Sequence, residues 1–289
     1  MITVIIPVYK NIDLFLNNLK HNLKFLRSCQ IIIVNDDPSK SIKKEVKQLK
    51  NKNIILIENK KNLGFGMSID VGSNYACNDY LFLLNSDVVL NDNQYLFALD
   101  HFKKNPNLFA VSFAQKEKNN QIMGKNIIYW KNGLFHHQKA TNLKFGRTAW
   151  AEGGSCLIDK KKFNFLGGFD EIYSPFYWED VDLSYRAWKS GFEIIFEPKI
   201  LVEHHHQSTI NKYFNKEIIK KIAFRNQVIF CWKNIADKNL FINHLTNLPK
   251  IIFEKGFFDA LIKLPEIIKK RSLFIKKDEE ILAIFKSLN

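Results

Sequence analysis

The sequence lacks the cysteine pattern of a secreted or zinc-stabilised domain. Its 289 residues include only four cysteines, and no two of them have the spacing of a zinc knuckle or of a redox-active CxxC pair. A disulfide-rich scaffold is therefore not indicated, and reduced, buried thiols in a cytosolic chain are expected. The four cysteines are Cys29, Cys77, Cys156 and Cys231.

The sequence also lacks a membrane-spanning segment and a secretion signal. No apolar run reaches the roughly 18 residues that a transmembrane helix needs. The first ten residues, MITVIIPVYK, have neither the basic start nor the small-residue cleavage site of a signal peptide, and they are typical of a strand instead. We therefore expect a cytoplasmic chain that is not an integral membrane protein.

Acidic residues are fewer than basic ones. Lysine and arginine number 43 against 29 aspartates and glutamates, for a formal net charge of +14. Such a charge favours an anionic partner, which is nucleic acid, a phospholipid surface or a phosphorylated substrate. No basic motif with interleaved aromatic residues is present, so nucleic acid is not expected. The excess is denser beyond residue 208, where 16 side chains are basic and 8 are acidic.

Short apolar runs alternate with helical patterns through the first hundred residues. Runs that are apolar throughout and separated by helices indicate a parallel sheet covered on both faces. Ligands of such sheets bind outside the carboxyl ends of the strands. The expected strands are Ile2–Val8, Ile31–Val34, Ile54–Glu58 and Tyr80–Leu84, and the expected helices are Asp13–Leu26, Ser41–Lys50 and Met67–Ala76.

The pattern changes twice further along the chain. Residues 105–150 contain short segments with Gly and Asn turns, which are typical of antiparallel strands. Beyond residue 210 the pattern is helical. An α/β domain over residues 1–210 followed by a helical, basic extension over residues 211–289 is therefore expected. The short strands expected within the second half of that domain are Cys156–Asp159, Glu193–Phe196 and Ile200–Val202.

Polar side chains follow two of the expected strands at their carboxyl ends. Asn85-Ser86-Asp87 is either a polar turn or part of a divalent-cation site, because Mg²⁺ and Mn²⁺ take oxygen ligands and often only one or two protein carboxylates. Asn35-Asp36-Asp37 is either a turn that ends at Pro38 or a pair of acids that bonds the base and ribose of a nucleotide. Both segments lie where the sheet would bind a ligand.

Two further segments have weaker patterns. Residues 60–66, KKNLGFG, precede an expected helix, where glycines and free N–H groups can approach a ligand, but they do not form a GxxxxGK[ST] loop. The triplet His204-His205-His206 is either an exposed polar cluster or the source of one imidazole ligand for Mn²⁺. Within it we favour His204, with His205 as the alternative.

The segment YWEDVDLSYR, residues 177–186, concentrates three carboxylates at the start of an expected helix. Acids in a first helical turn suit the helix dipole. Asp182 and Arg186 are four residues apart and can pair on one helix face, with Glu179 beside them. Asp180 lies about 100° from Glu179 around the helix and has no basic partner at helical spacing. Asp180 is therefore our candidate for a general base.

The order of these motifs is more specific than any one of them. Over about residues 1–235 the chain resembles the inverting glycosyltransferase family 2, and within it the rhamnosyltransferase-like bacterial members. The motifs that carry the resemblance are, in order, VIIPVYK, VNDDPS, NLGFGMSIDVG, LFLLNSDVVL, EGGSCLIDKKKF, GGFDE, WEDVDLSYRAWKSGF, HHHQS and FRNQVIFCWKN.

The resemblance implies a GT-A fold, with a Rossmann-like and mostly parallel sheet flanked by helices, in an enzyme of bacterial surface polysaccharide synthesis. Residues 1–104 would bind a nucleotide-sugar donor, a dTDP- or UDP-sugar, and residues 105–210 would bind the metal and the acceptor. A divalent cation, Mn²⁺ or Mg²⁺, would sit on the donor diphosphate, while Asp180 takes the proton of an acceptor hydroxyl.

Carried over position by position, the resemblance assigns roles to the matching residues. The metal would be held by Asp87 and His204. The acceptor would be bordered by Gly154, Trp178 and Glu179. The donor would be bound by Pro7, Tyr9, Asp36, Asp37, Asn62, Gly64, Phe65 and Ser86.

Three positions depart from the family pattern. Asn85 begins the metal-binding element where Asp is usual, Pro38 follows the two acids where a small residue is usual, and Asp70 stands where Asn is common. A nucleotide-sugar pyrophosphorylase (a nucleotidyltransferase) is the alternative from another class, but PVYKN lacks the Gly-rich, basic loop expected after its first strand. An inactive family member is the other alternative, against which Asp87 and Asp180 both argue.

The basic extension has two interpretations of its own. Residues 243–277 mix Leu, Ile and Phe with Lys, so their helices either pack on the catalytic domain or present a basic amphipathic surface to anionic lipid. A lipid-diphosphate-linked acceptor would suit the second case. A peripheral position at the inner face of the plasma membrane would then follow.

Overall fold

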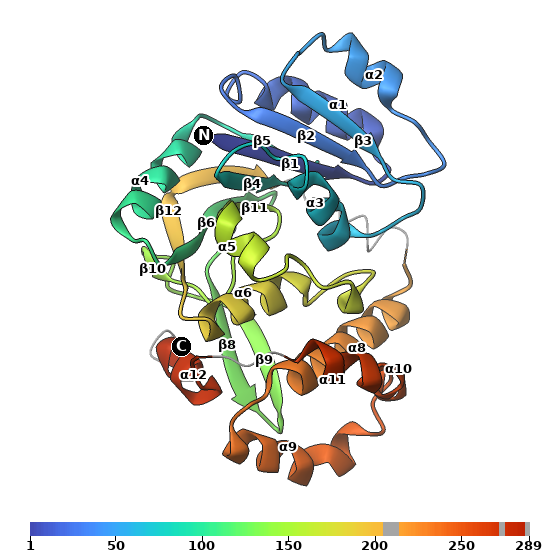
Figure 1. Cartoon of the computed structure of the whole chain (residues 1–289), viewed down its shortest axis with the longest axis vertical. Helices are drawn as coiled ribbons and strands as arrows, with labels where there is room; N and C mark the ends of the chain where they lie inside the picture. The colour runs from blue at the N-terminus through green and yellow to red at the C-terminus, as the bar shows by residue number, and fades with distance from the viewer. Residues whose placement is uncertain (205–213, 272–274, 287–289) are drawn as a thin grey trace.

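In the computed structural model, residues 1–204, 214–271 and 275–286 are described, and they form a mixed sheet flanked by helices with further helices at the C-terminal end (Figure 1). The expected α/β architecture is confirmed. The strands are β1 Ile2–Val8, β2 Gln30–Asn35, β3 Ile54–Glu58, β4 Tyr80–Leu84, β5 Val88–Leu90, β6 Leu108–Glu117, β7 Ile122–Met123, β8 Asn126–Lys131, β9 Leu134–Lys139, β10 Gly146–Arg147, β11 Ser155–Asp159 and β12 Glu193–His204. The helices are α1 Ile12–Asn22, α2 Lys43–Gln48, α3 Phe65–Ser73, α4 Ala98–Lys104, α5 Lys160–Phe165, α6 Glu179–Lys189, α8 Lys216–Asn234, α9 Lys238–Ile251, α10 Phe257–Ile262, α11 Leu264–Lys270 and α12 Asp278–Lys286, with 3-10 turns η1 Gln94–Phe97 and η2 Glu171–Tyr173.

The central sheet runs in the order β10-β12-β6-β11-β4-β1-β2-β3, with β5 on β12 and β7 on β6. Strands β4, β1, β2 and β3 are parallel neighbours, as the apolar runs predicted. Because these strands point the same way, the polar residues that follow β1, β2 and β4 meet at one edge of the sheet. That edge faces the start of α6.

Alternate residues of β1 pack on opposite faces of the sheet. Val4 and Ile6 belong to the core under α1, together with Phe15 of that helix, whereas Ile5 belongs to the core under α3, together with Ile69. All of these side chains are buried. A strand buried on both faces must be apolar throughout, which is why β1 reads as an unbroken run.

Strand β12 is one strand of twelve residues where the sequence suggested two short ones. Its pairing with β6 is interrupted between Glu197 and Leu201, where Pro198 lies. Proline has no N–H to donate and is tolerated in a sheet at such irregularities. The interruption lies between the two strands that the sequence predicted, but it does not end the strand. Pairing with β6 resumes at Leu201 and continues to His204.

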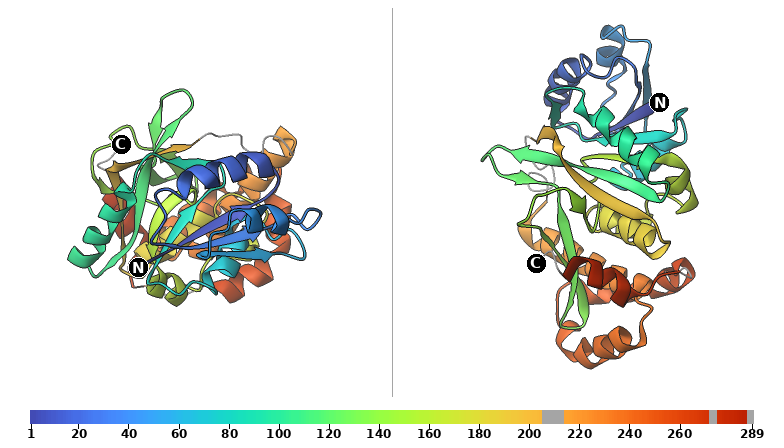
Figure 2. Two further views of the ribbon diagram at one scale, coloured as in Figure 1. Left: turned by 90° about the horizontal axis from the view of Figure 1, so that it is seen from above. Right: turned by 90° about the vertical axis from the view of Figure 1, so that its left-hand side faces the viewer.

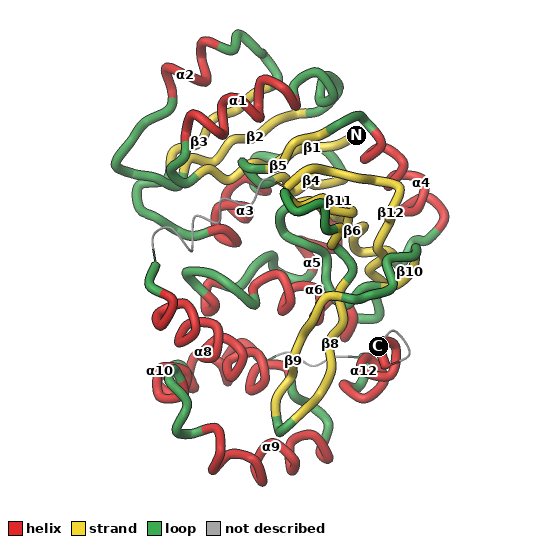
Figure 3. The backbone as a smooth tube through the Cα atoms, turned by 180° about the vertical axis from the view of Figure 1, so that it is seen from behind, coloured by secondary structure: helices red, strands yellow, loops and turns green. Residues whose placement is uncertain are grey.

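A second, two-stranded sheet stands apart from the first. Strands β8 and β9 form an antiparallel hairpin around Asn132 and Gly133, both of which have positive φ. Asn-Gly at a two-residue turn matches the right-handed twist of the strands it joins. Figure 3 shows this hairpin extending from the main sheet, with α8 beside β9 and α12 beside β8.

The C-terminal helices α8 to α12 gather below α6, at the end of the molecule away from α2 (Figure 1, and the right-hand view of Figure 2). Helix α8 buries Val228, Ile229, Phe230 and Cys231 completely. These side chains join the same core as those of α6 and α3. In the described residues the helical extension is thus packed on the α/β domain through a shared core.

Two further features of the fold concern membrane-spanning helices and the cysteines. Among the described residues, no helix is both long and apolar enough to cross a membrane. All four cysteines are free; Cys29, Cys156 and Cys231 are buried as expected, whereas Cys77 is exposed, so the prediction of a buried thiol is wrong there. Cys77 follows α3 directly before the turn into β4, at the surface.

Candidate active site

The strand ends and the start of α6 enclose a cavity of about 520 Å³. It is lined by most of the predicted site residues: Pro7, Tyr9, Asp36, Asn62, Gly64, Phe65, Ser86, Asp87, Gly154, Glu179, Asp180 and His204. Asp37 and Trp178 are not among the lining residues. Residues that are far apart in the sequence therefore lie together at the carboxyl edge of the sheet, where the sequence analysis expected a ligand to bind.

Asp36, at the end of β2, shapes the loop that precedes α3. Its Oδ1 accepts from the backbone N–H of Leu63 at 2.8 Å and from Asn59 Nδ2 at 2.8 Å, and its Oδ2 accepts from the N–H of Gly64 at 2.8 Å. Gly64 has φ 81°, a conformation that glycine adopts without strain. Asp36 thus holds the backbone of Leu63 and Gly64 in place at the edge of the cavity.

Asp37 points elsewhere. Its carboxylate accepts from the N–H and the hydroxyl of Ser39, within its own turn, at 3.0 and 2.5 Å. It is buried and does not line the cavity, so the structure places only Asp36 of the two acids at the cavity. The turn interpretation of this segment holds for Asp37.

Strand pairing brings His204 to Asp87. Strand β5 follows Asp87 directly and pairs antiparallel with the end of β12, with His204 opposite Val88. The Nε2 atom of His204 lies 3.2 Å from Oδ1 of Asp87, and its Nδ1 lies 2.7 Å from Oε1 of Gln115. His205, the alternative ligand, falls outside the described residues.

The Asp87–His204 pair fits a hard or borderline divalent cation. When Nδ1–H donates to Gln115, Nε2 presents a lone pair toward the Asp87 carboxylate, and the imidazole is oriented as in known metal sites. The 3.2 Å separation is close to that of adjacent ligands at about 2.1 Å from an octahedral ion. Among the described residues no group of three or more His, Cys, Asp and Glu side chains is arranged for a metal. The pair would therefore act with the ligands of a bound diphosphate and water.

Asp180 lines the cavity at the first turn of α6. Its Oδ1 accepts from the N–H of Val181 at 2.8 Å. Burial, and then the neighbouring carboxylate of Glu152, raise the pKa of Asp180 to about 6. A carboxylate with such a pKa is ionised near neutral pH and accepts a proton more readily than an exposed one.

The three acids of the segment lie in different electrostatic environments. Burial and then the charge of Asp180 raise the pKa of Glu179 to about 8, so Glu179 carries a proton at neutral pH. Burial also acts on Asp182, but Lys233 and Arg186 outweigh it and hold the pKa of Asp182 well below its usual range. The predicted Asp182–Arg186 ion pair is present at 2.7 Å.

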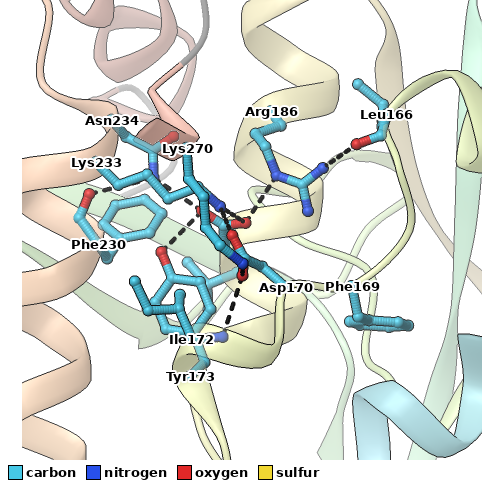
Figure 4. Close-up of polar contacts among 12 residues, drawn as sticks. Leu166, Phe169, Asp170, Ile172, Tyr173, Arg186, Phe230, Lys233, Asn234 and Lys270 are labelled. Atoms are coloured by element: carbon cyan, nitrogen blue, oxygen red, sulfur yellow. Dashed lines mark hydrogen bonds and ion pairs between the residues drawn. The ribbon is translucent and has the colours of Figure 1, made fainter. Parts of the chain in front are cut away.

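Asp182 belongs to a buried charge cluster that joins α6 to the C-terminal helices. Figure 4 shows Arg186, Lys233 and Asn234 of this cluster close together. Lys233 of α8 lies 2.9 Å from Asp182 and 2.6 Å from Asp170, and Lys270 of α11 lies 2.6 Å from Asp170. Asn234 donates to Asp182 at 2.9 Å. Buried carboxylates need such partners, because an uncompensated buried charge is strongly destabilising.

Trp178, which was predicted to border the acceptor, does not line the cavity. Trp178 is buried, with its ring 4.8 Å from that of His137 and 4.9 Å from that of Phe230. It directly precedes α6 and has φ 76°, in the left-handed region. The side chain anchors the start of the helix, while its neighbour Tyr177 lines the cavity.

Glu152 and Gln115 are among the polar residues of the cavity that sequence reasoning missed. Glu152 accepts from Asn126 at 2.9 Å and contacts Lys139, which outweighs burial and lowers the pKa of Glu152. Gln115 lies near the end of β6, which runs parallel to β12. The strand-end rule would have found Gln115 had β6 been recognised as a parallel strand.

The comparison with known sequences agrees with this arrangement. The sequence model described as Glycosyl transferase family 2 matches residues 3–167. A poly-beta-1,6-N-acetyl-D-glucosamine synthase of Staphylococcus epidermidis is 25% identical over 174 residues, which are 60% of this chain and 42% of that protein. The enzyme of the same name from Staphylococcus aureus strain MSSA476 is 24% identical over 201 residues, covering 68% and 48%. The chain spans about half the length of these curated relatives.

Two solved structures share the fold. GalNAc-T7, solved with UDP, GalNAc and Mn²⁺, superposes with a TM-score of 0.64 at 14% identity, over 96% of this chain and 59% of that one. The mannosyltransferase PcManGT from Pyrobaculum calidifontis, solved with GDP-Man and Mn²⁺, gives a TM-score of 0.56 at 12% identity, over 99% and 78%. Both similarities concern the fold.

Proposed function

The chain belongs to glycosyltransferase family 2, and on that premise we propose that it is an inverting, metal-dependent enzyme that moves a sugar from a nucleoside-diphosphate sugar to an acceptor hydroxyl. One observation carries the proposal. Asp180, with a pKa raised to about 6, lines the same cavity as the Asp87–His204 pair. The cavity thus combines a proton acceptor with a site suited to a diphosphate-bound cation.

The donor would lie across the carboxyl ends of β1, β2 and β4. Pro7 and Tyr9 follow β1, and Ser86 follows β4, all on the cavity wall. Gly64 and Phe65 form the opposite rim, held by Asp36. Backbone N–H groups at the start of α3 add a favourable environment for the negative charge of a donor.

Transfer would take place in one displacement. Asp180 would accept the proton of the acceptor hydroxyl while that oxygen bonds to the anomeric carbon and the bond from this carbon to the diphosphate oxygen breaks. The nucleoside diphosphate leaves with the bonding electrons, and the configuration at the anomeric carbon inverts because no enzyme nucleophile intervenes. Glu179, protonated at neutral pH, would donate a hydrogen bond to a sugar oxygen.

Asp87 and His204 would hold the cation, and Mn²⁺ bound there would stabilise the charge that develops on the leaving diphosphate. Mg²⁺ is the alternative ion. Gln115 would hold the imidazole in the orientation that leaves Nε2 available.

The names of the relatives support one choice of substrate class. The matched synthases are named for a polymer of N-acetyl-D-glucosamine, which favours a UDP-hexosamine or related UDP-sugar donor and a glycan acceptor of a bacterial surface polysaccharide. A dTDP-rhamnose donor, suggested by the motif pattern, is the other candidate. A lipid-diphosphate-linked glycan is the acceptor form that suits a basic chain.

The extension supports a peripheral position on an anionic membrane. Helix α10 exposes Phe258, Leu261 and Ile262 at helical spacing, and Phe253, just before it, is 86% exposed. Together with the surrounding lysines this is the pattern of an interfacial surface. Co-sedimentation with phosphatidylglycerol vesicles, compared with phosphatidylcholine, tests it: the Phe258→Glu and Ile262→Glu pair should release the protein, whereas Phe165→Glu, equally exposed elsewhere, should not. Equal binding by all variants would overturn the membrane proposal.

The proposed function is tested by a thermal-shift panel of dTDP-, UDP- and GDP-sugars with and without Mn²⁺. A rise in melting temperature for one nucleotide class, enhanced by Mn²⁺, is expected. The selected donor is then assayed for release of nucleoside diphosphate with glycan acceptors. Binding of nucleoside triphosphates with pyrophosphate release would instead indicate a nucleotidyltransferase, and donor binding without transfer to any glycan would favour the inactive alternative.

A further inference from the structure

Asn226 of α8 contacts the backbone just before the proposed base. It is fully buried, and its Nδ2 lies 2.7, 2.9 and 2.9 Å from the carbonyl oxygens of Tyr173, Phe176 and Tyr177. An amide has two hydrogens, so one of these three bonds is shared. A single side chain thus holds three carbonyl groups of the segment 173–177, and Phe176 and Tyr177 of this segment line the cavity.

The neighbouring arginine fixes the orientation of that amide. Arg225 Nε donates to Oδ1 of Asn226 at 2.9 Å, which directs Nδ2 to the carbonyl groups. The same guanidinium donates through Nη2 to the carbonyl of Ser174 at 2.6 Å. Both residues of α8 therefore serve the segment 173–177.

The segment that they hold is strained. Tyr177 and Trp178 have φ angles of 71° and 76°, the left-handed region that aromatic residues rarely adopt. Such a conformation is unfavourable and persists only where its surroundings enforce it. Glu179 and Asp180 follow immediately, so the position of Asp180 depends on this conformation.

Helix α8 also holds the far side of the same segment. Lys233 follows Asn226 by seven residues, which is about two turns, so the two lie on one face of the helix. Lys233 and Asn234 bond Asp182, two residues beyond Asp180. The proposed base is thus bracketed by contacts to a single rigid element.

We propose that Asn226 is a positioning residue for glycosyl transfer: through the backbone of residues 176–178 it holds the Asp180 carboxylate where the acceptor hydroxyl is deprotonated. The inference rests on the proposed role of Asp180. Asn226 does not line the cavity, so we expect its loss to affect the chemical step and the environment of Asp180 and to leave donor binding unchanged.

The test compares Asn226→Ala with Asn78→Ala in the full chain, with Asp180→Asn as the reference. Asn78 is also buried and donates to backbone and side-chain oxygens at the start of β1, away from the cavity, which makes it a control for lost stability. For Asn226→Ala we expect kcat to fall about 10- to 100-fold with the donor Kd unchanged. The acidic limb of the pH–rate profile should move below about 6, because water gains access to Asp180.

The outcomes separate the two proposals. If Asp180→Asn turns over normally, the base assignment fails whatever Asn226 does. If Asp180→Asn is inactive but Asn226→Ala matches Asn78→Ala in kcat and in pH profile, Asn226 is structural only and the inference is overturned. If Asn226→Ala does not fold, Arg225→Ala decides, since it removes the bond that orients the amide: a smaller fall in kcat with the same pH shift supports positioning, and a wild-type profile refutes it.

Discussion

The Nε2 atom of His204 lies 3.2 Å from Oδ1 of Asp87, and this contact joins the end of β12 to the loop after β4. If the pair holds Mn²⁺, replacing one of the two side chains should remove metal binding. The fold should be kept, because both residues are at the cavity surface. We expect His204→Gln to abolish the Mn²⁺-dependent stabilisation by donor, and Gln115→Met to weaken Mn²⁺ binding about 10- to 100-fold through lost orientation of the ring. Calorimetric titration of Mn²⁺ in the presence of nucleoside diphosphate measures both.

His101→Gln is the matched control for that titration. His101 pairs with Glu197 at 2.7 Å and does not line the cavity. Equal Mn²⁺ affinity in the His204 and His101 variants would contradict the metal assignment.

Glu152 sets the pH range of the proposed base. Since burial and the charge of Glu152 raise the pKa of Asp180 to about 6, wild-type activity should be lost as pH falls through about 6. Glu152→Gln removes that negative charge, so the pKa of Asp180 should fall and activity should persist to lower pH. Profiles of kcat/KM between pH 4.5 and 8 measure the shift; an acidic limb that stays in place would show that another group controls it.

Asp36 should control donor affinity through the loop it caps. In Asp36→Asn an NH2 group replaces one carboxylate oxygen, and this group cannot accept a hydrogen bond from the N–H of Gly64. A hydrogen bond to a charged group contributes about 1.5–3 kcal/mol, so we expect the donor KM to rise about tenfold or more with a fall in melting temperature. Asp159→Asn, which alters the N-cap of α5 away from the cavity, should change melting temperature without changing KM.

Asp70 makes stability depend on pH. Burial raises the pKa of Asp70 to about 7, whereas an unfolded aspartate titrates near 3.9. The protonated carboxyl therefore favours the folded state at low pH, and this contribution is lost as pH rises from about 4 through 7. Asp70→Asn should gain melting temperature relative to wild type across that window and level off above it. Parallel melting curves at all pH values would contradict the shift.

Asp278 should anchor α12 to α6. It is fully buried and accepts from Tyr185 at 2.7 Å, Lys189 at 2.8 Å and the N–H of Ala236 at 2.6 Å. Removing one partner of a buried ion pair typically costs about 3–5 kcal/mol, and we expect this loss in the free energy of unfolding of Asp278→Ala. Urea denaturation measures it. Glu280→Ala, exposed in the same helix, should have little effect, and equal losses would show that the pair is not stabilising.

The strands of the parallel half of the sheet were predictable because each of them is a short, continuous apolar run in the sequence. Ile54–Glu58 and Tyr80–Leu84 are observed to the residue, since each apolar run is bounded by turn residues. Helix ends were less accurate: α3 begins at Phe65, two residues before the expected Met67, because Gly64 supplies the turn.

What the sequence could not predict depends on pairing between distant segments. The continuity of β12 past Pro198 is decided by β6 and β5. The burial of Trp178 is decided by β9 and α8, whose His137 and Phe230 meet its ring. The helical spacing of Asp182 and Arg186 predicted one ion pair, and Lys233 reaches the same carboxylate from 51 residues away.

The contacts of α8 with the cavity wall have a consequence for engineering. Consider a chimera that takes the segment 173–182 from a relative with another acceptor. The exchange would replace the carbonyl groups that Asn226 contacts and the carboxylate that Lys233 contacts, while both of these α8 residues stay the same. To change the acceptor in this way, the segment 173–182 and the face of α8 that carries Asn226 and Lys233 should be exchanged together. A breakpoint between the α/β domain and its helices would separate the segment 173–182 from the α8 side chains that contact it.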